Sequence, residues 1–169
     1  MPSTYTLISS NVLSSSAASV TFSAIPSTYT DLVLRISTRV DFATLDSNVL
    51  IRFNGDTASN YSTTWLYGNG ASALSGRLST TRIIGTSMTE GTSATSNTFA
   101  TAEIYIPNYT ASQNKQISMD SATENNATTA YRAVDAALWR NTAAITSIEL
   151  DGSNFVSGSS FYLYGIKNS

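Results

Sequence analysis

The stretch Asp31-Leu-Val-Leu-Arg-Ile-Ser-Thr-Arg-Val40 alternates apolar and polar side chains, and it decides the fold class of this chain. In an extended strand successive side chains point to opposite faces, so residues two apart share a face. One face of this stretch holds Leu32, Leu34 and Ile36, whereas the other holds Val33, Arg35, Ser37 and Arg39. A period of two with one apolar face predicts a β-strand that covers a core on one side.

The same period recurs in three other places along the chain. The apolar faces there are formed by Val49, Ile51 and Phe53, by Ala102, Ile104 and Ile106, and by Phe161 and Leu163. The opposite faces include Arg52, Glu103, Tyr105, Tyr162, Tyr164 and Ile166. Turn residues at 54–56 end the first of these strands, and Pro107, which lacks an amide donor, ends the second. We expect one buried core built from Leu32, Leu34, Ile36, Val49, Ile51, Phe53, Ile104, Ile106, Phe161 and Leu163.

Weaker alternation brings the total to about ten short strands. Five further candidates are residues 5–9, 18–24, 61–67, 115–122 and 145–150. The run Ala130–Trp139 fits two patterns, because Tyr131, Val134 and Leu138 have helical spacing while Tyr131, Ala133, Ala137 and Trp139 alternate. We favour a strand, since the neighbouring segments are strands. Many short strands separated by turns predict an all-β sandwich or barrel.

The composition is polar through hydroxyls and amides rather than through charges. Ser, Thr and Asn supply 28, 24 and 13 of the 169 residues, against 9 Lys plus Arg, and the net charge is −2. With so few basic residues, attraction to a polyanion has no source, so we expect no nucleic acid partner. No segment approaches the roughly 20 apolar residues that cross a bilayer, so we also expect no membrane association.

Two stretches are low in complexity, and both predict surface loops with little to bury. They are residues 9–19, which are rich in Ser and Ala, and residues 86–98, which are rich in Ser, Thr, Gly and Asn. We expect residues 1–15 to form an N-terminal arm or first strand, and residues 16–169 to form a single domain.

The chain has no His and no Cys, which removes the usual catalytic triad, the commonest general base and the common zinc sites. A carboxylate pair is the enzymatic route left, and it needs two acids about 5 to 10 Å apart in a cleft. Asp41 and Asp46 fall in one predicted loop, while Glu103 and Glu149 point outward from predicted strands. Solvated surface acids explain all four, so we assign no catalytic residue and expect no enzyme.

Two other functions are compatible with these residue types, calcium binding and stacking on sugar rings. Oxygen-rich turns at 54–56 and 151–154 could hold calcium, but both match ordinary turn chemistry, so we expect no metal and no cofactor. Aromatic pairs could stack on sugars if several shared one exposed face: Trp65 and Tyr67, Tyr105 and Tyr109, Tyr131 and Trp139, Tyr162 and Tyr164. Core or protein-interface contacts are the simpler interpretation.

Several runs resemble a group of bacteriophage virion proteins with jelly-roll domains. They are residues 18–26, 29–37, 51–56 with Asn60-Tyr61, 103–109, and the ending 145–166, which looks like the closing hairpin of those modules. The resemblance spans almost the whole chain and implies a jelly-roll-like antiparallel β-sandwich. It supplies structural motifs and no catalytic residues.

The resemblance implies a structural protein of the virion. We expect a capsid decoration, or cement, protein on the outer surface of the head, bound to the major capsid protein as a homo-oligomer such as a trimer. The alternative is a tail fibre or baseplate module that binds a host surface glycan. A carboxylate-based glycan hydrolase is a third, weaker hypothesis. The lack of heptads and repeats favours the decoration protein over a fibre.

Overall fold

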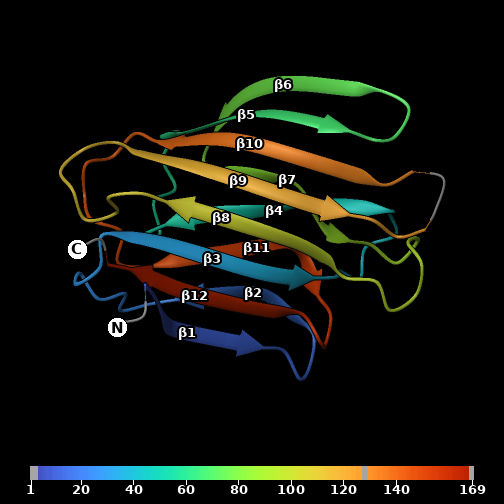
Figure 1. Ribbon diagram of the computed structural model, residues 1–169, viewed down its shortest axis with the longest axis horizontal. Helices are drawn as coiled ribbons and strands as arrows, with labels where there is room; N and C mark the ends of the chain where they lie inside the picture. Colours follow the sequence, from blue (N-terminus) through green and yellow to red (C-terminus); the bar gives the residue numbers. More distant parts are fainter. Residues whose placement is uncertain (1–3, 127–128, 168–169) are drawn as a thin grey trace.

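Two antiparallel sheets packed face to face form this protein, as the computed structural model of residues 4–126 and 129–167 shows (Figure 1). The described residues contain strands and turns but no helix. The predicted all-β antiparallel sandwich is therefore confirmed. Residues 1–3 of the expected N-terminal arm lie outside the described part, and so do residues 168–169.

The described residues form twelve strands, two more than the expected ten. Their bounds are β1 (Tyr5–Val12), β2 (Ala17–Phe22), β3 (Asp31–Thr38), β4 (Asp46–Phe53), β5 (Tyr61–Gly68), β6 (Ala73–Thr80), β7 (Ile83–Glu90), β8 (Ala100–Ile106), β9 (Lys115–Thr123), β10 (Tyr131–Trp139), β11 (Ile148–Phe155) and β12 (Ser160–Ile166). The larger sheet has the order β1-β12-β3-β8-β9-β10-β5-β6, and the smaller has the order β2-β11-β4-β7. The run Ala130–Trp139, which fitted both a helix and a strand, contains the strand β10, as we favoured.

Both predictions of low-complexity loops are wrong in part. Residues 9–12 belong to β1 and residues 17–19 to β2, so the first loop is four residues long. Residues 86–90 belong to β7, where Thr86, Ser87, Thr89 and Glu90 are buried. Small polar residues can enter a sandwich when hydrogen bonds satisfy their polar groups, and composition alone does not reveal those partners.

The core between the sheets contains every apolar residue that alternation predicted. All ten are at most 3 % exposed. Aromatic residues complete it, with Phe53 packed against Tyr61 and Trp139, and Phe155 against Phe161. Val33 is also buried, although it points to the outer face. Its cross-strand neighbours Tyr105 and Tyr164 stand on either side of it and cover it.

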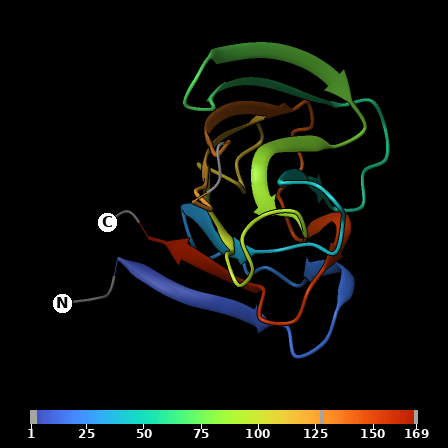
Figure 2. The same ribbon diagram turned by 90° about the vertical axis from the view of Figure 1, so that its right-hand side faces the viewer.

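The two sheets are unequal, with eight strands facing four. Figure 2 shows the consequence, because β5 and β6 continue the larger sheet beyond the smaller sheet. At the opposite end of the molecule β1 and β2 lie close together, joined by residues 13–16 (Figures 1 and 2). The overhang of β5 and β6 positions the candidate site.

Candidate functional site

A groove of about 370 Å³ opens where the overhanging strands face the edge of the smaller sheet. Residues from β4 and β7 line one wall, and residues from β5, β6 and β10 line the other. The lining comprises Asp46, Asn48, Trp65, Tyr67, Leu78, Ile84, Thr86, Ser87 and Tyr131. A concave site with aromatic walls and a few convergent polar groups is the usual form of a small-ligand site.

Three aromatic rings form a continuous wall of this groove. Trp65 and Tyr67 are two residues apart on β5, so they share a face, and their rings stack with centroids 5.3 Å apart. Tyr131 meets Tyr67 edge-to-face, with centroids 5.5 Å apart. All three side chains are partly exposed. They therefore offer ring surface to a ligand.

The position of Trp65 depends on a glycine in the neighbouring strand. Gly76 of β6 lies directly opposite Trp65. A Cβ at Gly76 would come within 2.3 Å of Cζ2 of the indole. The absence of a side chain at this position lets the indole lie flat against β6.

The polar wall is built on a bulge in β7. Pairing with β4 shifts between Ser47 and Val49, so three residues of β7 stand against one residue, Asn48. Ser87, at the centre of the bulge, has a φ of 48°, a left-handed conformation that is uncommon for a residue with a side chain. Bulges of this kind occur beside functional sites, where they redirect side chains.

Side chains from both sheets hold the backbone of this bulge. The amide of Ser87 donates to Oδ1 of Asn48 at 3.1 Å, and its hydroxyl donates to Oδ2 of Asp46 at 2.6 Å. The amide of Thr86 donates to Oδ2 of Asp135 at 2.8 Å, while its carbonyl accepts from the Ser121 hydroxyl at 2.7 Å. These bonds fix the polar wall before any ligand binds, which lowers the ordering cost of binding.

The site is acidic. Burial raises the pKa of Asp46, and the hydrogen bond from Ser87 opposes this rise. Burial also raises the pKa of Asp135 to about 6, against the lowering effect of its bonds from Thr86. Asp135 is 5 % exposed, and its Oδ1 has no hydrogen-bond partner among the described residues. None of the nine lining residues is basic.

The other aromatic candidates lie elsewhere. Trp139 and Tyr109 are buried, and the indole of Trp139 donates to Asp56 at 2.8 Å. Tyr105 donates to Asp31 at 3.0 Å on the outer face of the larger sheet. Tyr164 is also on that face, where the Arg35 guanidinium lies 5.9 Å from its ring centroid. The structure therefore brings Trp65, Tyr67 and Tyr131 together in the groove, whereas Tyr105 and Tyr164 lie on the outer face of the larger sheet and Tyr109 and Trp139 lie in the core.

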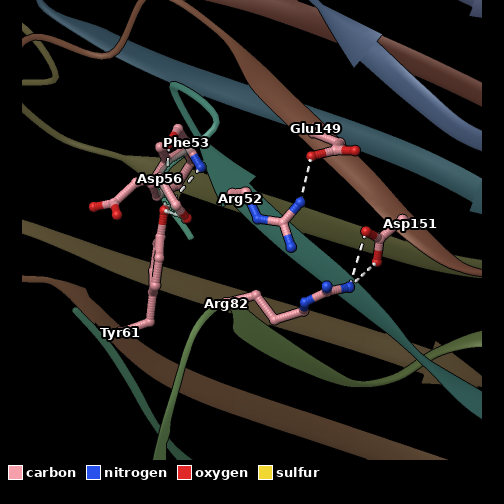
Figure 3. Close-up of polar contacts among 7 residues, drawn as sticks. All are labelled: Arg52, Phe53, Asp56, Tyr61, Arg82, Glu149 and Asp151. Carbon is pink, nitrogen blue, oxygen red and sulfur yellow. Dashed lines mark hydrogen bonds and ion pairs between the residues drawn. The ribbon is translucent and has the colours of Figure 1, made fainter. Parts of the chain in front are cut away.

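The acids singled out by the sequence are distributed over the surface rather than paired. Asp41 accepts from Asn154 at 2.9 Å, and Glu103 forms an exposed ion pair with Arg35 at 2.8 Å. Glu149 forms an ion pair with Arg52 at 2.9 Å on the smaller sheet (Figure 3). Of the four, Asp46 alone lines the groove in the described part of the chain.

The two oxygen-rich turns bind donors of the protein itself. Asp56 accepts from Asn60, Trp139 and the amide of Ala58, and these bonds lower its pKa to about 2. Asp151 accepts two bonds from Arg82, at 2.8 and 2.9 Å (Figure 3). Within the described ranges, no group of three or more acidic side chains is arranged to hold a metal ion.

Comparison with protein-family models, with curated proteins and with solved structures found no match. The resemblance to phage virion proteins therefore stays a prediction. In the ranges 4–126 and 129–167 there is no helix long and apolar enough to span a bilayer.

Sequence reasoning missed half of this site. The alternation of Trp65 and Tyr67 marked one wall, but Thr86 and Ser87 of the other wall lie in the stretch 86–98 that we expected to be a loop. One short sequence feature indicates a strand in this wall, the apolar pair Ile83-Ile84 just before the polar stretch 86–98. Three bulge residues then break the period of two, so alternation does not continue through them.

Proposed function

We propose that this protein is a non-catalytic module that binds a carbohydrate in the groove between β5–β6–β10 and β4–β7. One observation carries the proposal, the wall of Trp65, Tyr67 and Tyr131 that faces Asp46 and Asn48 across the groove. Sugars combine apolar C–H faces with hydroxyl groups. Such a ligand matches a site that has rings on one side and carboxylate and amide acceptors on the other.

The charge of the groove narrows the class of sugar. Asp46 is the charged lining residue, and neither Lys nor Arg contributes to either wall. An anionic sugar would meet a carboxylate without a compensating cation, which is unfavourable in a partly buried site. We therefore propose a neutral or amino sugar, whose hydroxyl or ammonium groups donate to Asp46.

We propose that the groove binds the sugar and does not cleave it. Glycoside hydrolysis uses two carboxyl groups that flank the bond to be cleaved. In this groove Asp46 is bonded to Ser87, while Asp135 is nearly covered and its Oδ2 accepts the Thr86 amide. That amide belongs to the groove wall, so we assign Asp135 the role of holding the wall in place.

Where the protein lies in a phage particle is inferred from the sequence resemblance. A glycan groove favours the tail fibre or baseplate module over the capsid decoration protein. The decoration role, with binding to the major capsid protein, stays a proposal of second rank. The number of copies in a purified particle separates the two, because a shell protein is present in hundreds of copies and a tail protein in few.

Binding can be measured by titrating the protein with neutral, amino, sialylated and sulfated oligosaccharides while following tryptophan fluorescence. The chain has two tryptophans, and Trp139 is buried in the core, so a ligand-induced change reports on Trp65. We expect binding of neutral or amino sugars, and loss of binding in Trp65→Ala when it is measured by calorimetry. The control variant is Tyr162→Ala, which removes a partly exposed ring from β12.

A second pair of variants tests the aromatic wall without removing a ring. Gly76→Ala places a methyl group against the Trp65 indole and should weaken binding at least tenfold. Gly68→Ala is the matched control, because the nearest atom to its added Cβ is 3.9 Å away. Binding to anionic sugars alone would contradict the charge argument, and unchanged affinity in Gly76→Ala would contradict the groove as the site. Release of reducing ends would show that the module is catalytic.

A further inference from the structure

The side of the sandwich formed by β1 and β2 differs from the rest of the chain in charge. The sequence contains 20 charged residues, 9 basic and 11 acidic, and the first of them is Asp31. β1 and β2 both precede it. They are the outermost strands of their sheets, so the described surface at this side of the molecule includes two strand edges without charged residues.

Strand edges of this kind are normally protected. An edge strand offers a row of backbone donors and acceptors to another chain, and natural proteins block it with Lys, Pro, bulges or short strands. β1 is eight residues long, contains neither Lys nor Pro, and has β12 as its one neighbour among the described strands. It has a single register shift, between Leu7 and Ser9. From Ser9 to Val12 its pairing with β12 is regular.

We propose that β1 pairs with β1 of a second copy, antiparallel about a two-fold axis, so that the eight-stranded sheet continues from one copy into the other. The regular part, residues 9–12, forms the centre of this contact. An antiparallel edge is self-complementary under a two-fold axis, because each strand presents the same alternation of N–H and C=O groups. A charge-free strand also meets its own copy without repulsion.

Exposed apolar side chains support a second copy as the partner. Leu7 and Val12 are 52 % and 58 % exposed, and both lie on the outer face, opposite Tyr164 and Ser160 respectively. Pairing of two β1 strands brings these side chains from both copies together on one face, where they bury one another. The free edge at the other end of the sheet, β6, carries Arg77 and therefore suits self-pairing less well.

The oligomeric state tests the proposal, and it does so independently of sugar binding. Size-exclusion chromatography with light scattering on the full chain should give twice the 18.0 kDa mass of one copy. Ser10→Lys puts like charges on both sides of the two-fold axis and should abolish the dimer, as should Val12→Lys. Ser75→Lys, at an exposed position on β6, is the matched control and should leave it intact.

Three results would contradict the pairing of two β1 strands. A native chain that stays monomeric at high micromolar concentration overturns the proposal. A mass of three copies, as the sequence resemblance implied, overturns the two-fold pairing. A dimer that survives Ser10→Lys and Val12→Lys, with both variants folded by circular dichroism, shows that β1 is not the contact.

Discussion

Asp135 gives the sharpest quantitative prediction, because it is a nearly buried carboxyl group without an ion-pair partner among the described residues. Its side chain accepts from Thr86, but its Oδ1 has no donor in the described part of the chain. Burial raises the folded-state pKa from 3.8 to about 6. We compare the native chain with Asp135→Asn, which keeps an oxygen acceptor for the Thr86 amide and does not titrate.

The sign follows from proton linkage. The folded protein binds the Asp135 proton more tightly than the unfolded chain, so folding is favoured by low pH. Relative to Asp135→Asn, the native free energy of unfolding is highest below about pH 4, falls as the pH rises through about 6, and is level by about pH 8. A shift of about two pKa units corresponds to a change of up to about 3 kcal/mol.

Urea denaturation of both proteins at several pH values between 4 and 8 measures this change. Replacing Asp135 by Asn can change the free energy of unfolding by a constant amount at every pH. This amount does not affect the test, because the prediction concerns how the difference between the two proteins varies with pH. Asp46 and Glu90, whose pKa values burial also raises, are present in both proteins, so their effects cancel to first order. Parallel pH profiles for the two proteins would refute the assignment of Asp135 as a buried carboxyl group with a raised pKa.

Three other predictions concern the core and the turns. Phe53→Ala removes a fully buried ring from the aromatic cluster and should lower the free energy of unfolding by about 3 to 5 kcal/mol in urea denaturation. Asn54→Ala loses bonds to Ala144, Thr146 and Ser147 and leaves alanine at a φ of 52°, so it should cost about 2 to 4 kcal/mol. Asn54→Gly should recover the part of this free energy that comes from the positive φ, but not the part that comes from the lost hydrogen bonds. Chelation by EDTA should leave the melting temperature unchanged, because Asp56 and Asp151 already bind donors of the protein.

The sequence predicts the core well because alternation is a local signal. Leu34 and Phe161 could be assigned to one core from their own strands, without knowing how the strands pair. The β7 bulge could not be predicted, since its buried polar residues depend on partners from distant strands. Asp135 and Ser121 supply those partners from β10 and β9. The groove is missed for the same reason, as one wall of it is this bulge.

The two proposed surfaces follow from one rule, that an open strand edge accepts a further strand unless it is distorted or charged. Because the smaller sheet ends at β7, β5 and β6 extend past its edge, and the aromatic side chains of β5 face the groove at this edge. The edge of β7 is distorted by its bulge, which makes it a poor template for a further strand. The groove beside it therefore stays open to a ligand. The edge of β1 lacks such a distortion between residues 9 and 12 and lacks charge, so the same physical rule predicts strand addition there.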